Sequence, residues 1–396
     1  MANSKLPDQD CMLPFFAPDH LILRERTRRW VEEKGLSFSR RHGDLAERAI
    51  GWVRELGAGG FLKHAVSEEF GGIRATVQAR DLCILREELA RGDALADTMF
   101  AMQALGSYPI SLAGNREQKS RLLPAVARGE CIGAFAITEP DAGSDVASLQ
   151  TRAVRHGNEF SLTGTKRFIS NAGIADNYVV FAATEPEKKA KGISVFLLAA
   201  NTPGLLIKEK IELLAPHPIG VIEFADCAVG EDALLGKEGE GLKIAFATLD
   251  LLRCSVGAAA VGLAQRALDE AVQYSKTRRQ FGRPIGEFQG IEFKLAEMVT
   301  ELEASRLLVY QAAWAHDCAD DDAKRKSSMA KFYATEAAQR IVDQALQIHG
   351  GNGLIAGSIM ERLYRDVRAL RIYEGTSEIQ KVIIARELLK AIGNRQ

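Results

Sequence analysis

The sequence predicts an α+β fold in which helices and strands occupy separate stretches of the chain. Residues from about 19 to 130, and again from about 239 onward, are rich in Ala, Leu, Glu and Arg, as helices are. Between these two regions, short apolar or alternating segments bounded by turn residues indicate strands. The order of helices, strands and helices favours segregated layers over an alternating βαβ sheet.

Length and composition set the domain count. The chain has 396 residues, of which 46% are hydrophobic and 26% charged, as in an ordinary globular protein, so disorder and fibrous folds are excluded. Single hydrophobic cores stop growing above ~250 to 300 residues, so we expect several domains. The predicted divisions are an N-terminal extension (1–18), a helical domain (19–130), a β-domain (131–238) and a C-terminal helical bundle (239–396).

Each region has its own local signals. The N-terminal helical region is interrupted at Gly57, Gly59-Gly60 and Gly71-Gly72. In the β-domain we expect strands at 132–137, 159–164, 178–183, 193–198 and 221–224. After residue 239, two apolar stripes at helical spacing indicate long helices. These stripes are Ile291, Leu295, Met298, Leu302 and Val309, and then Ala334, Ala338, Ile341, Ala345 and Ile348.

Charge and cysteine usage limit the partners and the compartment. Lys and Arg number 51 against 52 Asp and Glu, so the overall field attracts neither nucleic acid nor an anionic membrane. The longest apolar run, Val256 to Ala264, is shorter than the ~18 residues of a membrane span, and no secretion signal is visible. Six scattered cysteines without a CxxC pair indicate a reducing compartment and no metal site. We expect a cytoplasmic protein.

Three common cofactor and nucleophile motifs are missing from the sequence. No GxGxxG follows a strand, and no GxSxG elbow occurs. The segment Gly230 to Lys237 has the wrong spacing for a P-loop, and Glu238 stands where Ser or Thr would hold magnesium. Nicotinamide, nucleotide-triphosphate and serine-hydrolase chemistries are therefore disfavoured.

Two segments of the β-domain carry residues suited to a cofactor. In AFAITEPDAGSD (134–145), exposed backbone N–H groups and Ser144 could cradle phosphate oxygens, although a solvated turn has the same composition. In GTKRFISNAGIAD (164–176), Phe168 beside Ser170 could cover a planar heterocycle and hydrogen-bond to its edge. Taken alone, such a Phe is more often part of the core.

Two segments of the C-terminal region carry charge or acid–base chemistry. In TRRQFGRPIGEFQ (277–289), Arg278 and Arg279 could reach phosphates and Phe281 could stack on a base, or the segment is a basic loop. In RIYEGTSEIQ (371–380), one interpretation has Ser377 and Gln380 forming a capping box with Glu374 exposed before the helix. In the other, apolar neighbours desolvate Glu374, raise its pKa and make it a base.

Together with QIHGGNG (347–353), these four segments resemble the acyl-CoA dehydrogenase family in order and spacing, from about Asp19 to the C-terminus. The resemblance implies a helical N-domain, a middle β-barrel-like domain and a C-terminal four-helix bundle, assembled as a homotetramer around FAD. It also implies that Glu374 removes the α-proton of an acyl-CoA while the β-hydride leaves to flavin N5. The electrons would then pass to an electron-transfer flavoprotein.

The resemblance also assigns roles by position. Expected flavin contacts in the chain's own site are Ile137, Thr138, Ser144, Phe168, Ser170, Thr376 and Glu378. Contacts to the ADP half of a neighbouring subunit's flavin are expected at Arg278, Phe281, Gln347 and Gly351. Substrate contacts are expected at Ser144, Asp250, Arg253, Tyr373 and Gly375. The chain departs from the family pattern with Phe for Trp at 168, Ser for Thr at 170 and Glu for Gln at 378.

Alternatives remain at the level of chemistry and of substrate. An oxidase, a decarboxylating dehydrogenase or a desulfinase on the same scaffold would have flavin and CoA sites of almost the same sequence. A more distant alternative is a non-catalytic flavin-binding paralogue that binds DNA or a protein. The acyl pocket is expected to draw on Asp97 to Tyr108, where Met99, Phe100 and Met102 form either its wall or helix core. A short or medium acyl group, straight, branched or cyclic, is the substrate we expect.

Overall fold

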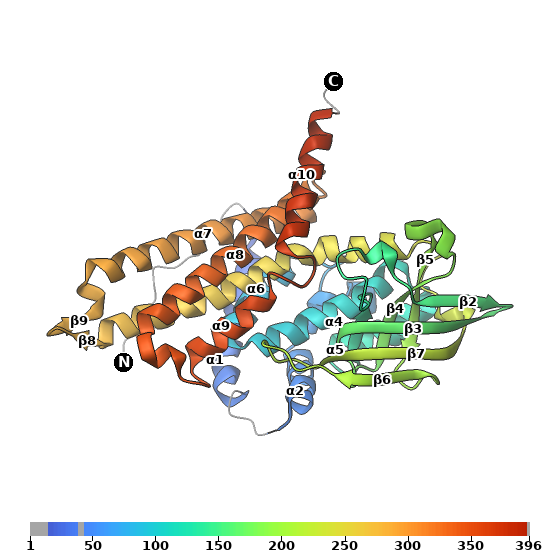
Figure 1. The fold of residues 1–396 in the computed structure, drawn as a ribbon, viewed down its shortest axis with the longest axis horizontal. Helices are drawn as coiled ribbons and strands as arrows, with labels where there is room; N and C mark the ends of the chain where they lie inside the picture. The colour runs from blue at the N-terminus through green and yellow to red at the C-terminus, as the bar shows by residue number, and fades with distance from the viewer. Residues whose placement is uncertain (1–14, 39–42, 394–396) are drawn as a thin grey trace.

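The computed structural model describes residues 15–38 and 43–393, and its order of helices, strands and helices confirms the predicted fold class (Figure 1). The predicted N-terminal extension, 1–18, lies for the most part outside the described residues. In the view of Figure 1 the β-domain lies at one end of the long axis and the long C-terminal helices run toward the other. The N-terminal helices pack beside both.

The N-terminal domain is a cluster of helices whose starts are set by polar caps. The side chains of Asp44 and Asn115 each accept a hydrogen bond from the backbone N–H of the third helical residue. Each cap residue also donates its own backbone N–H to that residue's side chain, so both form capping boxes. The helices are α1 (Pro18–Phe38), α2 (Leu45–Ala58), α3 (Ala79–Gly92), α4 (Ala94–Ala113) and α5 (Arg116–Arg128).

The middle domain is a seven-stranded sheet with the order β1-β4-β2-β3-β7-β6, and β5 pairs with β4. The five predicted strands are present as β1, β3, β4, β5 and β7, whereas β2 and β6 were not predicted. The strands are β1 (Gly133–Ala136), β2 (Arg152–His156), β3 (Glu159–Ser170), β4 (Asn177–Ala183), β5 (Ile193–Ala199), β6 (Leu205–Lys210) and β7 (Ile219–Gly230).

The C-terminal domain is built on α6, which is long because its apolar residues are buried on all sides. Its most apolar stretch has the length and composition of a membrane span, but 78% of that stretch is buried inside the protein, as in a core helix. Helix α10 projects away from the body in Figure 1. The elements are α6 (Gly241–Thr277), β8 (Arg279–Gln280), β9 (Arg283–Pro284), α7 (Gln289–Asp317), α8 (Ala323–His349), α9 (Ile359–Ala369) and α10 (Ser377–Gly393).

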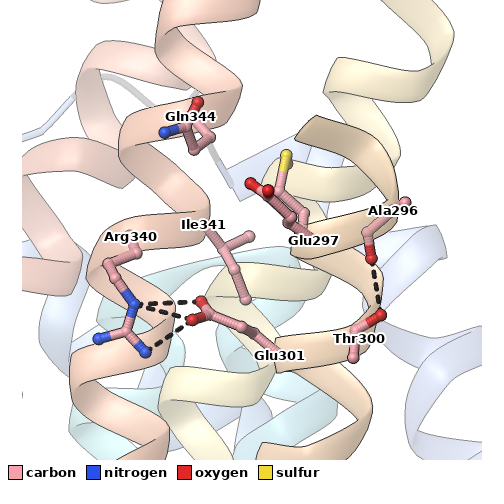
Figure 2. A pocket seen from close by; sticks show the side chains of 8 residues that line it. Ala296, Glu297, Thr300, Glu301, Arg340, Ile341 and Gln344 are labelled. Atoms are coloured by element: carbon pink, nitrogen blue, oxygen red, sulfur yellow. Dashed lines mark hydrogen bonds and ion pairs between the residues drawn. The ribbon is translucent and has the colours of Figure 1, made fainter. Parts of the chain in front are cut away.

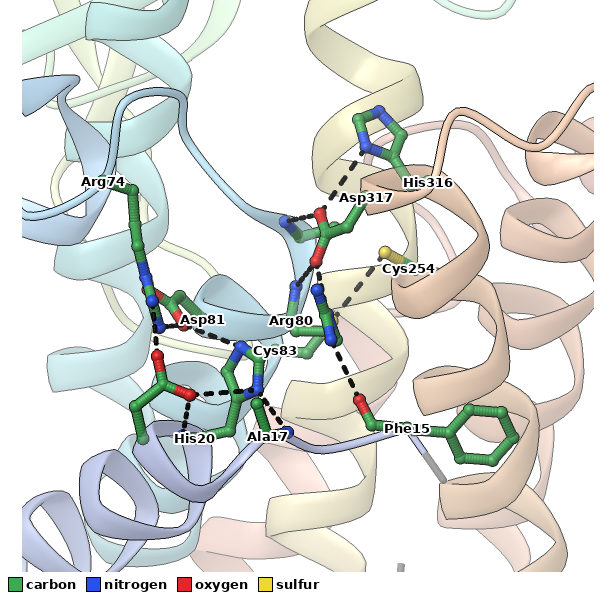
Figure 3. A network of polar contacts seen from close by, with 12 residues as sticks. Phe15, Ala17, His20, Arg74, Arg80, Asp81, Cys83, Cys254, His316 and Asp317 are labelled. Atoms are coloured by element: carbon green, nitrogen blue, oxygen red, sulfur yellow. Dashed lines mark hydrogen bonds and ion pairs between the residues drawn. The ribbon is translucent and has the colours of Figure 1, made fainter. Parts of the chain in front are cut away.

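The N-terminal and C-terminal domains are joined by close packing and by charge. A Cβ on Gly262 of α6 would lie 2.1 Å from the Glu87 carbonyl oxygen of α3, so only glycine allows this approach. Figure 3 shows Asp317 of α7 at the start of α3, where its carboxylate accepts from the Ala79 amide at 2.7 Å and from Arg80 Nε at 2.7 Å. An acid at a helix N-terminus is favourable, so this contact fixes α3 on the bundle.

Candidate active site

The predicted base sits in a strained tight loop between α9 and α10. Glu374 and Gly375 have φ angles of +54° and +88°, in the left-handed region that non-glycine residues rarely adopt. Lys331 of α8 donates to the Gly375 carbonyl at 2.6 Å, and Gln380 donates to the same oxygen at 2.9 Å. These two donors hold the loop in a conformation that costs free energy locally.

The cap of α10 and the burial of Glu374 together distinguish the two interpretations of the segment 371–380. The helix begins at Ser377, and the Thr376 hydroxyl accepts from the Ile379 amide at 3.3 Å. Ser377 instead donates to Glu336 at 2.6 Å, so the predicted Ser377 cap is wrong. The Glu374 side chain is only 11% exposed, as the desolvated interpretation requires.

Burial raises the pKa of Glu374, because removing a carboxylate from water penalises its charged form. Three nearby cations, Arg86, Lys331 and Arg253, oppose this rise, and Asp97 adds to it. The nearest of the cations, Arg86 Nη1, is 4.0 Å from Glu374 Oε1. Glu374 Oε2 is buried and has no hydrogen-bond partner. A desolvated carboxylate with one free oxygen is suited to accept a proton from a bound molecule.

On the β-domain side, a bulge turns Phe168 out of the sheet. Lys166 pairs with Ile222 and Ile169 with Gly220, so β3 contains one more residue than β7 between these pairs. Phe168 takes a φ of +56° and is 49% exposed, with the Arg167 guanidinium 5.1 Å from its ring centre. A ring presented in this way can cover a planar group.

Ser170, two residues beyond Phe168, is oriented by a histidine. Its Oγ is 2.9 Å from His217 Nε2, while His217 Nδ1 is 3.3 Å from the Ala215 carbonyl oxygen. A carbonyl only accepts, so Nδ1 carries the proton, and burial lowers the pKa of His217. The neutral ring therefore accepts the Ser170 proton, and the serine oxygen remains available as an acceptor.

The turn that carries Ile137, Thr138 and Ser144 is held by a buried ion pair. Lys166 donates to Glu139 at 2.7 Å and to the Ile137 carbonyl at 3.1 Å, and burial lowers its pKa to about 8. Ile137 is buried, Thr138 is half-buried and Ser144 is exposed. The turn is thus rigid at its base and open to solvent at its tip.

Two interactions connect the loop of Glu374 to α6 and to the segment before β7. Asp250 and Arg253 form a hydrogen-bonded ion pair on α6, and Arg253 is close enough to influence the Glu374 pKa. Arg365 of α9 donates to the Leu214 carbonyl at 3.0 Å, which links the helix before Glu374 to the segment that carries His217. The two sides of the site are therefore connected. Tyr373 is half-buried beside Glu374.

A second group of predicted residues lies at the other end of α6 and α8. Along α8, Lys331 and Gln347 are 16 residues apart, which is ~24 Å at 1.5 Å per residue. Phe281, at a φ of +49°, is 93% exposed in the β8–β9 hairpin. All four members of this group are exposed: Arg278, Phe281, Gln347 and Gly351. Glu378 is also exposed, at the start of α10.

The residues expected in the acyl pocket fall into two groups. Met99 and Phe100 are fully buried in α4 and Met102 is 8% exposed, so the first two belong to the helix core. Asp97 is buried next to Arg86, close to Glu374. Three residues of the site were not predicted, because no pattern in one sequence distinguishes them from surface charges: Arg86, Lys331 and His217.

Other hollows lie away from this site. Figure 2 shows one of about 440 Å³ between α7 and α8, where Arg340 pairs with Glu301 at 2.9 Å. Another, of about 550 Å³, is lined by Arg54, Arg128 and Asp176 among others. Among residues 15–38 and 43–393, no group of three or more His, Cys, Asp or Glu side chains is arranged to hold a metal ion.

The fold combines a helical domain, a β-domain and a helical bundle, and it holds a largely buried carboxylate at the predicted site. Three domain models match in order: acyl-CoA dehydrogenase N-terminal domain (residues 17–130), middle domain (134–227) and C-terminal domain (239–389). The chain belongs to the acyl-CoA dehydrogenase family, whose members are oxidoreductases acting on a CH–CH bond.

Named relatives are similar over most of the chain. The chain is 40% identical to a 3-(aryl)acrylate reductase of Clostridium sporogenes, over 95% of this chain and 100% of that one. It is 42% identical to an acyl-CoA dehydrogenase of Bacillus subtilis, over 85% and 89%. A solved structure reported with the electron transferring flavoprotein of Acidaminococcus fermentans matches with a TM-score of 0.88 at 35% identity, covering 94% of this chain and 98% of that chain.

FAD is the cofactor of this family. An acyl-CoA dehydrogenase from Bacillus anthracis was solved in complex with FAD, and it matches with a TM-score of 0.86 at 30% identity, covering 96% of this chain and 68% of that chain. The residues of this chain fit such a group. The outward ring of Phe168 offers a stacking face, and the Ser170 oxygen offers an acceptor on the same strand.

Proposed function

We propose that this protein desaturates an acyl-CoA thioester between its α and β carbons, with Glu374 as the base. The observation that supports this best is a carboxylate that is 11% exposed, has a raised pKa and keeps one oxygen unbonded. An α-proton is a very weak acid, so an ordinary Glu with a pKa of ~4.3 is too weak a base for it. Desolvation strengthens the base, and positioning of the thioester supplies much of the remainder.

The other predicted residues have supporting roles in this proposal. FAD, when bound, supplies the acceptor for the β-hydride. Phe168 would cover its ring, Ser170 would lie at N5, and Ile137, Thr138, Thr376 and Glu378 would contact its edges. The pair Asp250 and Arg253 would bind the CoA arm, and Ser144, Tyr373 and Gly375 would line the path of the thioester.

Reduction of an acrylate-type double bond is the second candidate, because a relative that is 40% identical over 95% of this chain is named a 3-(aryl)acrylate reductase. The same residues serve this direction. A protonated Glu374 would return its proton to the α-carbon, and the raised pKa favours that protonated form. Which direction prevails depends on the electron partner.

Assembly and partners also belong to the proposal. The exposed group at Arg278, Phe281, Gln347 and Gly351 supports a homotetramer in which one chain holds the ADP half of a neighbour's flavin. We propose an electron-transfer flavoprotein as the acceptor, since one similar structure was reported with such a protein. We place the protein in the cytoplasm and in fatty acid metabolism, and the free cysteines of the described residues support a reducing compartment.

The test is anaerobic bleaching of the flavin by a panel of acyl-CoAs. Glu374→Gln should retain FAD and bind the thioester but lose at least ~10² to 10⁴-fold in bleaching rate, as removal of a general base does. The control is Glu117→Gln, an exposed acid on α5 to which no role in the site is assigned, which should bleach at a rate close to that of the unaltered protein. In the unaltered protein the bleaching rate should rise with pH, because Glu374 must be ionised to act. The midpoint of this rise should lie above the pKa of an ordinary glutamate.

Three additional measurements separate the rival chemistries. An oxidase would consume oxygen with the acyl-CoA, a decarboxylating enzyme would release carbon dioxide, and a desulfinase would release sulfite. A protein that binds FAD but is bleached by no thioester and shifts DNA in a salt-sensitive manner would support the non-catalytic alternative. Normal bleaching in Glu374→Gln would remove Glu374 from the mechanism.

A further inference from the structure

A buried ion pair from two other helices lies directly behind Glu374. Arg86 of α3 and Asp97 of α4 are 1% and 3% exposed. Their contact is a fork: Nε to Oδ1 at 2.8 Å and Nη2 to Oδ2 at 3.0 Å. The remaining edge of the guanidinium, Nη1, donates to Ser255 of α6 at 3.1 Å. A bidentate pair in this geometry is rigid and keeps the guanidinium in one orientation.

The edge of Arg86 that faces Ser255 also faces the base. Nη1 is 4.0 Å from Glu374 Oε1, which is too long for a hydrogen bond but well within the range of charge. The shorter contacts of Arg86 go to Asp97 and Ser255 instead. Arg86 therefore acts on the Glu374 carboxylate through its charge and does not form a hydrogen bond with it.

The charges around Glu374 show a pattern of internal balance. Arg86 is paired with Asp97, and Arg253 with Asp250. The third cation, Lys331, is bonded to a neutral carbonyl. The half-buried Tyr373, next to Glu374 in the chain, is a further titratable group in electrostatic contact with this carboxylate. Each arginine near the base is thus paired with an aspartate, and of the three cations only Lys331 acts on the carboxylate without such a pair.

We propose that Arg86 and Asp97 are positioning residues for the base: the fork aims the Nη1 edge of Arg86 at Oε1 of Glu374, and Asp97 cancels the charge that would otherwise lock the base in an ion pair. This inference rests on the proposed function, in which Glu374 exchanges a proton with the α-carbon. A pair that served only to join α3 to α4 would affect stability but would not affect the titration of Glu374. The two roles are therefore separable.

Two variants test the charge and the orientation independently. Asp97→Asn preserves the shape but leaves Arg86 uncompensated, so the acid limb of the bleaching rate should move to lower pH by about one unit, a tenfold change in proton affinity. The double variant Arg86→Met, Asp97→Leu removes no net charge and replaces the pair with apolar groups, a change that buried pairs tolerate. The pH of its acid limb should stay close to that of the unaltered protein. The bleaching rate should fall about tenfold or more at every pH, because no guanidinium then orients the Glu374 carboxylate.

The matched control is a second α3–α6 contact far from the base. Arg91 and Asp269 pair at 2.7 Å with about a third of each side chain exposed. The double variant Arg91→Met, Asp269→Leu should change neither the acid limb nor the rate. A change there equal to that at Arg86 and Asp97 would mean that helix packing, not local charge, controls the base.

Infrared spectroscopy of the FAD-loaded protein measures the titration of Glu374 in the absence of substrate. The carbonyl band of protonated Glu374, assigned by subtracting the spectrum of Glu374→Gln, gives the carboxyl titration directly. The Asp97→Asn variant should lower its midpoint by about one unit. Suppose that butyryl-CoA and the rest of the acyl-CoA panel bleach the unaltered protein and that Glu374→Gln abolishes bleaching. If Asp97→Asn then shifts neither the pH dependence of bleaching nor the infrared titration of Glu374, the role of the Arg86 and Asp97 pair is wrong while the proposed function stands. If no thioester bleaches the unaltered protein, the proposed function fails, and the infrared titration still decides the role of the pair.

Discussion

The two ends of α8 differ in how much of a site one chain completes. At the Lys331 end, the loop of Glu374 is held by donors from the same chain and its carboxylate is 11% exposed. At the Gln347 end, the predicted cofactor contacts are exposed, and Phe281 presents 93% of its surface to solvent. The first end is closed by its own chain, and the second end is open.

The difference follows from what each end requires. A base must be desolvated to gain strength, and desolvation needs a fixed, buried and charge-balanced surrounding that only a folded chain supplies. A stacking aromatic and a phosphate-binding arginine need only be presented, because the molecule they bind completes the burial. A single chain can therefore build the acid–base chemistry and leave cofactor retention to assembly.

The strongest way to break this comparison is to open the closed end. Lys331→Met keeps the aliphatic stem but removes the donor to the Gly375 carbonyl, so the left-handed loop loses one of its two anchors. A displacement of ~1 Å at a reacting group costs about 10²-fold in rate, and the loss of one hydrogen bond from a carbonyl that keeps its Gln380 donor costs about 0.5 to 1.5 kcal/mol. Flavin bleaching and urea unfolding measure both.

A lysine on the same helix is the control for this change. Lys324 pairs with Glu387 of α10 at 3.5 Å and is 46% exposed. Its replacement by Met should cost less than ~1 kcal/mol and leave the bleaching rate unaltered, as for an exposed ion pair. Equal effects at the two positions would show that the loop does not depend on Lys331 in particular.

The open end can be tested at Phe281. Its side chain contacts little within the chain beyond Phe288, whose ring centre is 6.0 Å away, so Phe281→Ala should leave the unfolding free energy of the chain nearly unchanged. An aromatic anchor in an interface is worth about 2 kcal/mol or more, so FAD retention should weaken by ~30-fold and the oligomer should dissociate more readily. Flavin content after dialysis and sedimentation measure these two effects.

The control for Phe281 is Ile22→Ala on α1, which removes a side chain that is 69% exposed. It should change neither flavin content nor sedimentation. If Phe281→Ala keeps its flavin as the unaltered protein does, the hairpin has no part in cofactor retention, and the open end is an ordinary surface.

The fold was predictable from the sequence where side-chain periodicity was strong. The five predicted strands are buried on at least one face, whereas β6 (Leu205–Lys210) lies at the edge of the sheet and is exposed almost throughout, so no alternation marks it. In β2 (Arg152–His156) only Ala153 is buried, which leaves no alternating pattern either. Edge and surface strands are specified by their neighbours more than by their own residues.

The candidate site was predictable only in part, for a related reason. The apolar neighbours of Glu374 indicated desolvation, and the structure places its side chain out of solvent. The residues that govern its charge, Arg86, Asp97 and Lys331, come from three helices distant in sequence, and each is an ordinary helix residue in its own context. Contacts of this kind depend on helix packing, which one sequence does not reveal.

The last comparison concerns the pH dependence of stability at a carboxyl group of α9. Burial raises the pKa of Asp366 of α9 to about 7, with Asp93 as a further cause, against 3.8 for an unburied aspartate. Between these values the folded chain binds more protons than the unfolded chain, so the unfolding free energy falls as pH rises through this window. Asp366→Asn removes this loss and should stabilise the protein by up to ~4 kcal/mol at pH 8, at ~1.4 kcal/mol per pKa unit, and hardly at all near pH 4, as urea midpoints at both pH values would measure. The exposed Asp343→Asn on α8 should show no such pH dependence. A gain of the same size for both variants would mean that net charge, and not the burial of Asp366, sets the response.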